Sequence, residues 1–202
     1  MSGSDDKSVR LWDMRSRESR YPIQILEDAK DSIGSVCVKG TSIAVGSVDG
    51  CVRIYDIRKG GMTSDNLKGK NDTSKNYCNS SFLACLDAVT SVKLNSDSQF
   101  YLASLMNSTI QLIDGPSGKV LNTFKGHEQT KYRLESCFTA DESMVMSCSE
   151  DSIIYVWDWL MESGVTKVLK GHAKAVVSLA AHPKNNSVLL SASSDGTIKL
   201  WE

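Results

Sequence analysis

The sequence predicts an all-β fold built from repeated β-hairpins, and two observations carry the prediction. First, one twelve-residue pattern occurs five times, as SGSDDKSVRLWD, VGSVDGCVRIYD, ASLMNSTIQLID, SCSEDSIIYVWD and SASSDGTIKLWE. Second, each copy places an Asp or Asn before a run in which apolar and polar residues alternate. Alternation with a period of two beside such a turn residue is typical of a β-hairpin. Each copy is therefore expected to supply two antiparallel strands joined by a tight turn.

The spacing of the copies indicates one structural unit per repeat. The residue before each terminal acid recurs at intervals of 43, 58, 44 and 44 residues, so one interval carries about 14 additional residues. The surplus lies between Asp56 and Val89 in a segment rich in Asn, Ser, Lys and Gly. We expect a solvated loop there, and a docking or phosphorylation segment is the alternative.

Two Gly-His dipeptides, Gly126-His127 and Gly171-His172, stand about 30 residues before a Trp-Asp or Trp-Glu pair. With a period near 44, this pattern resembles the WD-repeat family, whose fold is a β-propeller of four-stranded blades. The resemblance covers the whole chain. It implies an all-β WD-repeat propeller in the form of a partial ring of about four to five blades, that is, an N-terminally truncated seven-bladed propeller.

The repeat pattern also divides the chain into blades. Residues 1–26 are expected to be the remnant of one blade with its outer strand, and 170–202 a blade that lacks its outer strand; the blades between them are 27–66, 87–124 and 125–169, and residues 67–86 form the inserted loop. In the blade 27–66, residues 62–66 are expected to form the outer strand. Because Met1 stands in the middle of a repeat, we expect an N-terminally incomplete gene model or isoform. The alternative is a natural partial ring that pairs with another chain.

In the WD-repeat family a loop His, a strand Ser or Thr, the turn Asp and the strand Trp form a hydrogen-bonded tetrad. The resemblance assigns such tetrads to two blades: His127, Ser147, Asp151 and Trp157, and then His172, Ser191, Asp195 and Trp201. Ser149 and Ser193 share the strand face with the assigned serines, so the choice of serine stays open. Other blades keep only part of the pattern, at Asp6, Trp12, Asp49, Tyr55 and Asn107. Tyr55 and Ile113 replace Trp, so their blades should lack a complete tetrad.

Composition and charge exclude several classes of function. The chain has 23 Lys and Arg against 24 Asp and Glu, a net charge of −1 that argues against direct binding to nucleic acid or an anionic membrane. No apolar stretch approaches the roughly 20 residues of a membrane span, and the first 15 residues hold no apolar signal core. The six cysteines include no C-x-x-C pair, which favours reduced thiols over disulfides or a zinc site. We expect a soluble protein of the cytoplasm and nucleus without metal or cofactor.

No residue is predicted to be catalytic. The turn acids recur at one repeat position, where a structural role explains all of them, and His182 before Pro183 is expected to be a surface turn residue. The favoured interpretation is a non-catalytic protein-interaction platform with no small-molecule substrate. A hydrolase or lyase propeller is the alternative, and it would need a convergent polar cluster and usually a metal in the central channel. A third hypothesis is a non-functional truncated product.

Two irregular segments, EDAKDSIGSV and KGHEQTKYRL, are similar to WD-repeat scaffolds of mitogen-activated protein kinase cascades that also belong to spliceosomal complexes. The resemblance implies kinase-cascade components and spliceosomal proteins as partners. Partner contacts are expected in the loops on the face that carries the Asp turns, at Asp31, Val48, Lys131, Glu150, Lys174 and Ser194. Trp159 is expected to pack in the core or at a blade edge, and a partner anchor is the alternative.

Overall fold

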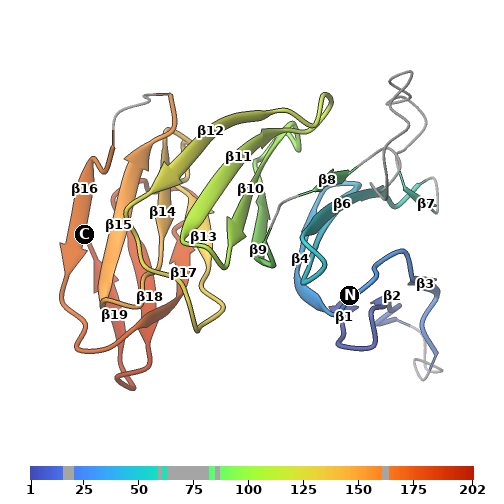
Figure 1. Ribbon diagram of the computed structural model, residues 1–202, viewed down its shortest axis with the longest axis horizontal. Helices are drawn as coiled ribbons and strands as arrows, with labels where there is room; N and C mark the ends of the chain where they lie inside the picture. Colours follow the sequence, from blue (N-terminus) through green and yellow to red (C-terminus); the bar gives the residue numbers. More distant parts are fainter. Residues whose placement is uncertain (16–20, 59–60, 63–81, 85–86, 161–163) are drawn as a thin grey trace.

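The computed structural model describes residues 1–15, 21–58, 61–62, 82–84, 87–160 and 164–202. These residues form five antiparallel sheets that follow one another in chain order, from the N-terminal sheet on the right of Figure 1 to the C-terminal sheet on the left. The predicted all-β architecture of successive blades is confirmed. Within the described segments, no helix has the length and apolar character that a membrane crossing requires.

The first two sheets contain the first two copies of the repeat. The first has the order β1-β2-β3, with β1 at Ser2–Gly3, β2 at Val9–Leu11 and β3 at Gln24–Leu26. The second contains β4 (Ile33–Lys39), β5 (Ser42–Ser47), β6 (Cys51–Asp56), β7 (Gly61–Met62) and β8 (Phe82–Ala84).

The outer edge of the second sheet differs from the prediction. Two short strands, not one, pair with β6: β7 pairs with its end, where Tyr55 lies opposite Met62, and β8 pairs with its start, where Cys51 lies opposite Ala84. Residues 82–84 were expected in the inserted loop and instead belong to the blade. Backbone hydrogen bonding to the free edge of β6 explains the difference, because a strand edge pairs with any extended segment that reaches it. The rest of the expected insertion, apart from Phe82–Ala84, and the expected outer strand beyond Met62 lie outside the described residues.

The remaining three sheets follow the blade pattern closely. The third has the order β12-β11-β10-β9 and the fourth β13-β14-β15-β16, while the fifth contains three strands in the order β17-β18-β19. Their bounds are β9 Val89–Leu94, β10 Phe100–Leu105, β11 Thr109–Asp114, β12 Val120–Lys125, β13 Ser136–Phe138, β14 Met144–Ser147, β15 Ile153–Asp158, β16 Lys167–Lys170, β17 Val176–Ala181, β18 Leu189–Ser193 and β19 Ile198–Trp201.

The hydrophobic core lies between consecutive sheets. Each of four clusters joins one sheet to the next; for example, Ala44 and Val52 of the second sheet pack with Val89 and Val92 of the third. Gly46 permits this close approach, because a Cβ atom there would lie 2.6 Å from the Val89 side chain. The first strands β4, β9, β13 and β17 contact one another in succession. They therefore line the inner side of the stack.

The third strand of each repeat shows why the alternating pattern predicts burial. Val52, Ile110 and Ile154 hold the same repeat position and are all 0% exposed, because the next sheet covers them. Ile198 holds this position in the last sheet and is 75% exposed, since no sheet of the described residues packs on that side.

Candidate interaction face

In the second to fifth sheets, the loop that leads into the first strand meets the turn between the second and third strands. In the second sheet the Val48 N–H donates to the Ser32 carbonyl over 2.9 Å, and in the fifth the Ser194 N–H donates to the Ala175 carbonyl over 2.9 Å. These loops and turns lie at the lower end of the sheets in Figure 1 and form what we call the turn face. Backbone hydrogen bonds thus hold the turn face in one shape.

The C-terminal blade contains a continuous network of four side chains. The Trp201 indole donates to Ser191 Oγ over 2.8 Å, and Ser191 Oγ lies 2.7 Å from His172 Nε2. On its other side, His172 Nδ1 lies 3.0 Å from Asp195 Oδ2. With the His172 proton on Nδ1, each group has a donor or an acceptor opposite it, so a neutral imidazole satisfies the network. The structure brings these four residues together in the arrangement that the resemblance implies, with Ser191 as the serine.

The preceding blade does not form this network, which corrects the expectation for Ser147, Asp151 and Trp157. The Trp157 indole donates to the Lys125 carbonyl over 3.2 Å, and the Ser147 hydroxyl donates to the Cys148 carbonyl. The Asp151 carboxylate accepts the Tyr155 hydroxyl at 2.7 Å. Tyr155 competes for the carboxylate because it lies four residues beyond the turn acid, on the same side of the strand. The alternative serine of this blade, Ser149, binds backbone groups of Glu128.

His127, the fourth expected member of that network, is buried and takes no part in it. It is 3% exposed, and neither ring nitrogen has a hydrogen-bond partner among the described residues. Its ring meets the Trp157 ring edge-on, with the centroids 5.7 Å apart. Burial lowers the pKa of His127 to about 4, although the Gln129 amide and the Asp151 charge act in the opposite direction. The imidazole is therefore neutral at physiological pH and packs as a planar side chain.

In the second sheet an ion pair takes the place of the tetrad. Arg53 donates to Asp49 Oδ2 over 2.7 Å and to Ser47 Oγ over 2.7 Å, and its side chain is only 1% exposed. Desolvation raises the pKa of Asp49, but the hydrogen bonds from Arg53 and Ser47 outweigh it and lower the pKa to about 2. Tyr55, at the Trp position, is 3% exposed. The blade therefore lacks a complete tetrad and still satisfies its turn acid.

The first and third sheets satisfy their turn residues locally. Asp6 accepts from Arg10 at 2.6 Å, and the Trp12 indole donates to Ser2 Oγ over 2.9 Å. The Asn107 amide donates to Asp87 Oδ2 over 2.6 Å. The turn acids are thus engaged in structural contacts in every sheet that has one.

Glu150, an expected partner contact, stabilises the loop in front of β13. Its carboxylate accepts hydrogen bonds from the backbone N–H groups of Thr130, Lys131 and Tyr132 and from the Thr130 hydroxyl. Partial desolvation raises its pKa, but these donors outweigh it and lower the pKa to about 2. The carboxylate therefore orders the loop in front of β13, and a charge reversal at Glu150 tests loop order rather than partner contact.

The other five expected contact residues lie on loops or turns of the turn face. Lys131 and Lys174 are exposed, and the backbone carbonyl of Lys174 accepts the Ser193 hydroxyl over 3.0 Å. Asp31 and Ser194 are also exposed, whereas Val48 is partly buried. The side chains of Lys131 and Lys174 are thus the cationic groups that this set presents to solvent.

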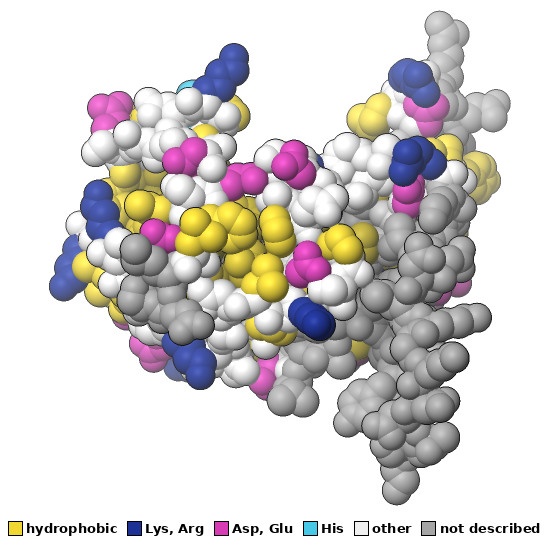
Figure 2. Space-filling model, turned by 90° about the horizontal axis from the view of Figure 1, so that it is seen from above, with side chains coloured by type: hydrophobic (Ala, Val, Ile, Leu, Met, Phe, Trp, Pro, Cys, Tyr) yellow, Lys and Arg dark blue, Asp and Glu magenta, His cyan; other side chains and the backbone are white. Residues whose placement is uncertain are grey.

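The structure contains a pocket that the sequence did not predict, on the face opposite the turn face. Figure 2 shows that face from above. The pocket encloses about 450 Å³ at the ends of β4, β9, β13 and β17, and Lys39, Lys93 and His182 are among its lining residues. The sequence holds no motif for it, because its residues come from turns that differ between repeats. Near this end of the blades, Trp159 packs edge-on against Phe100, with ring centroids 5.4 Å apart, so the packing interpretation of Trp159 agrees with the structure.

Side chains of the types that can ligate metals are spread over the described part of the chain. Among the described residues, no group of three or more His, Cys, Asp or Glu side chains is placed to hold a metal ion. Cys37, Cys51, Cys137 and Cys148 are free thiols, and Cys78 and Cys85 lie outside the described residues.

The family model described as "WD domain, G-beta repeat" matches residues 1–13, 20–56, 118–158 and 163–202. The chain belongs to the WD-repeat family. Its repeats account for the blades, the Gly-His loops and the turn acids described above. Residues 87–117 fall outside this match, yet they form the first three strands of a regular WD-type blade.

Similar proteins carry one recurring name. The chain is 31% identical to the WD repeat domain-containing protein 83 homolog of Dictyostelium discoideum over 229 residues, which cover 100% of this chain and 64% of that protein. It is 38% identical to WD repeat domain-containing protein 83 of Rattus norvegicus (93% and 52% covered) and 40% identical to that of Xenopus tropicalis (91% and 52% covered). The chain thus spans about half to two thirds of the length of these relatives.

Proposed function

We propose that this WD-repeat protein is a non-catalytic scaffold that binds other proteins through its turn face. The observation that carries the proposal is the use of the turn acids. Asp6, Asp49, Asp151 and Asp195 are each bonded to a side chain of their own blade, to Arg10, Arg53, Tyr155 and His172 respectively. A carboxylate held in this way fixes the shape of its turn, and this structural role accounts for the acid in each repeat without a reaction.

The rigidity of the turn face also supports the proposal. Backbone hydrogen bonds join loop to turn in successive blades, and Glu150 fixes a further loop with four accepted hydrogen bonds. A preorganised surface binds a partner with a smaller loss of conformational entropy. Binding residues are found disproportionately on loops that a rigid scaffold positions, and the turn face consists of such loops.

The finer proposal follows the resemblance of the irregular segments. The chain corresponds to the C-terminal four blades of a seven-bladed mitogen-activated protein kinase organiser, and its partners are kinase-cascade components and spliceosomal proteins. We place it in the cytoplasm and the nucleus on the same basis. The similarity to relatives named WD repeat domain-containing protein 83 supports the choice of this group within the WD-repeat family.

Affinity purification of the tagged chain from its source cells, followed by mass spectrometry, tests both levels. The test variant carries Lys131→Glu and Lys174→Glu, two exposed residues of the turn face. The matched control is Lys119→Glu, which changes another exposed lysine, in the turn between β11 and β12 at the other end of the sheet.

We expect the test variant to lose proteins that the wild type and the control retain. Enrichment of kinase-cascade or spliceosomal proteins in the retained set supports the finer proposal. An unchanged set of co-purifying proteins in the test variant would argue against the turn face.

A further inference from the structure

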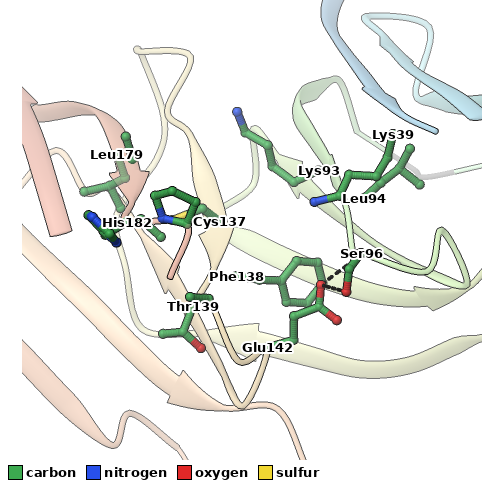
Figure 3. Close-up of a pocket in the computed structure, with 14 residues that line it drawn as sticks. Lys39, Lys93, Leu94, Ser96, Cys137, Phe138, Thr139, Glu142, Leu179 and His182 are labelled. Atoms are coloured by element: carbon green, nitrogen blue, oxygen red, sulfur yellow. Dashed lines mark hydrogen bonds between the residues drawn. The ribbon is translucent and has the colours of Figure 1, made fainter. Parts of the chain in front are cut away.

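The pocket opposite the turn face lies where the four inner strands end. Lys39 is the last residue of β4, Lys93 and Leu94 end β9, Phe138 ends β13, and His182 follows β17. Figure 3 shows Lys39 and Lys93 on one side of the space, His182 on the other, and Cys137 and Phe138 between them. The pocket thus draws on four different blades and is separate from the proposed partner face.

The floor of the pocket is apolar. Leu94, Cys137, Phe138 and Leu179 line it, and each of them is less than 10% exposed as a residue. Burial raises the pKa of the Cys137 thiol to about 12, so the sulfur stays protonated and uncharged. Such a floor favours an aliphatic side chain of a ligand.

Two side chains at the rim of the pocket, His182 and Lys39, offer hydrogen-bond donors. His182 Nδ1 accepts the N–H groups of Lys184 and Asn185 at 3.1 and 3.0 Å, which leaves Nε2 to carry the proton of the neutral ring. Lys39 is exposed and forms no ion pair with another described residue. An ammonium group and an imidazole N–H both require acceptors from a ligand.

The carboxylates around the pocket are already occupied. Glu142 accepts from the backbone N–H of Ser96, from the Ser96 hydroxyl at 2.7 Å and from the Asn95 amide at 3.3 Å. Glu135 lies 3.6 Å from Lys93 Nζ and accepts the Ser178 hydroxyl. These two carboxylates are therefore already engaged by donors of the protein, whereas Lys39 and His182 offer donors to a ligand.

We propose that this pocket binds a short acidic peptide segment of a partner protein. An aliphatic side chain of the segment rests on the floor, its acidic side chain pairs with the Lys39 ammonium group on one side, and a backbone carbonyl of the segment accepts the His182 Nε2–H on the other. The proposal rests on the scaffold function and adds a second binding site of defined chemistry, so that one partner binds the turn face while an acidic segment binds the opposite face.

Nuclear magnetic resonance with defined probes tests the ligand class directly. The ¹⁵N- and methyl-labelled chain is titrated with the C-terminal amide of N-acetyl-leucyl-glutamate, with the C-terminal amide of N-acetyl-leucyl-glutamine, in which a neutral amide of similar shape replaces the one carboxylate, and with acetate. We expect saturable shifts at Leu94, Leu179 and Ala181 with the glutamate probe, and at least about tenfold weaker binding of the other two, equivalent to about 1.4 kcal/mol. Equal binding of the glutamine probe, binding of acetate with the same affinity, or the absence of saturable shifts would overturn the proposal.

Two variants localise the effect. Lys39→Ala should weaken binding of the glutamate probe at least about tenfold, whereas Lys119→Ala, an exposed lysine outside the pocket, should leave it unchanged. Wild-type affinity of Lys39→Ala would overturn the assigned role of the ammonium group. Because the probes bind without a partner protein, failure of this titration leaves the co-purification result for the turn face intact, and the two proposals fail separately.

Discussion

Arg53 and Asp49 form a buried ion pair inside the second sheet, with Arg53 Nη2 2.7 Å from Asp49 Oδ2 and their side chains 1% and 9% exposed. The pair spans the same distance along the chain as Tyr155 and Asp151 in the fourth sheet and Arg10 and Asp6 in the first. A residue four positions beyond the turn acid thus satisfies that acid where the Trp-Ser-His network is absent.

Removal of one partner of this pair should be strongly destabilising. Asp49→Ala leaves the Arg53 guanidinium buried without its carboxylate, and we expect a loss of about 3–5 kcal/mol in the free energy of unfolding. Asp13→Ala is the control, because its partner Arg15 is 92% exposed and such pairs contribute about 1 kcal/mol or less. Chemical denaturation measures both values. Equal losses for the two variants would show that burial of the ion pair does not determine its contribution to stability.

Trp157 provides the largest fully buried side chain of the core. It is 2% exposed and stacks with Tyr155, with ring centroids 5.9 Å apart. Trp157→Ala should lower the free energy of unfolding by about 3–5 kcal/mol, because it creates a cavity and removes the indole hydrogen bond to Lys125. Leu160→Ala is the control, since Leu160 is 80% exposed, and it should change stability by less than about 0.5 kcal/mol. A melting temperature unchanged by Trp157→Ala would contradict the packing of this blade.

The two assigned serines should differ in their contribution to stability. Ser191 accepts from the Trp201 indole and contacts His172 Nε2, so Ser191→Ala leaves two polar groups without partners and should cost about 1–3 kcal/mol. Among the described residues, the Ser147 hydroxyl donates to the neighbouring Cys148 carbonyl alone, and we expect a smaller cost for Ser147→Ala. Thermal unfolding of the two variants compares them. A larger loss for Ser147→Ala would mean that the network is in the other blade.

His127 should make stability depend on pH. Its pKa is lowered from 6.5 to about 4 by burial, so the unfolded chain binds this proton more tightly than the folded chain. The free energy of unfolding therefore has its full value above pH 6.5. It decreases by at most about 3 kcal/mol as the pH falls toward 4, because the unfolded chain takes up the proton first. Urea unfolding at pH 7 and pH 5 measures the loss, and His127→Phe should reduce it. The exposed His182→Gln is the control. An identical pH dependence in the wild type and His127→Phe would refute the buried neutral imidazole.

Much of the fold follows from the sequence because its cause is local and repeated. The alternating pattern after each turn acid predicts that Val52, Ile110 and Ile154 are buried. Their burial depends only on the next blade, which the next repeat supplies. The outer edge of the second sheet could not be predicted in the same way. The pairing of Cys51 with Ala84 joins residues across a long insertion, and no local pattern fixes which extended segment reaches the edge of β6.

The candidate sites show the same limit. The network of His172 with Asp195 could be predicted because its members recur in register, whereas the failure of the equivalent network depends on one side chain, Tyr155, that competes for Asp151. The role of Glu150 and the pocket around Lys39 arise from contacts between loops of different length, for which a single sequence holds no signal.

Binding of partner proteins to the turn face is tested best by the affinity of one purified partner. The partner is the protein most enriched with the wild-type chain, and its dissociation constant is measured by calorimetry for the wild type, for Lys131→Glu with Lys174→Glu, and for Lys119→Glu. If the turn face binds the partner, the double variant alone should bind at least about tenfold more weakly, and all three proteins should have the same melting temperature. Equal affinities for the wild type and the double variant would contradict binding through the turn face.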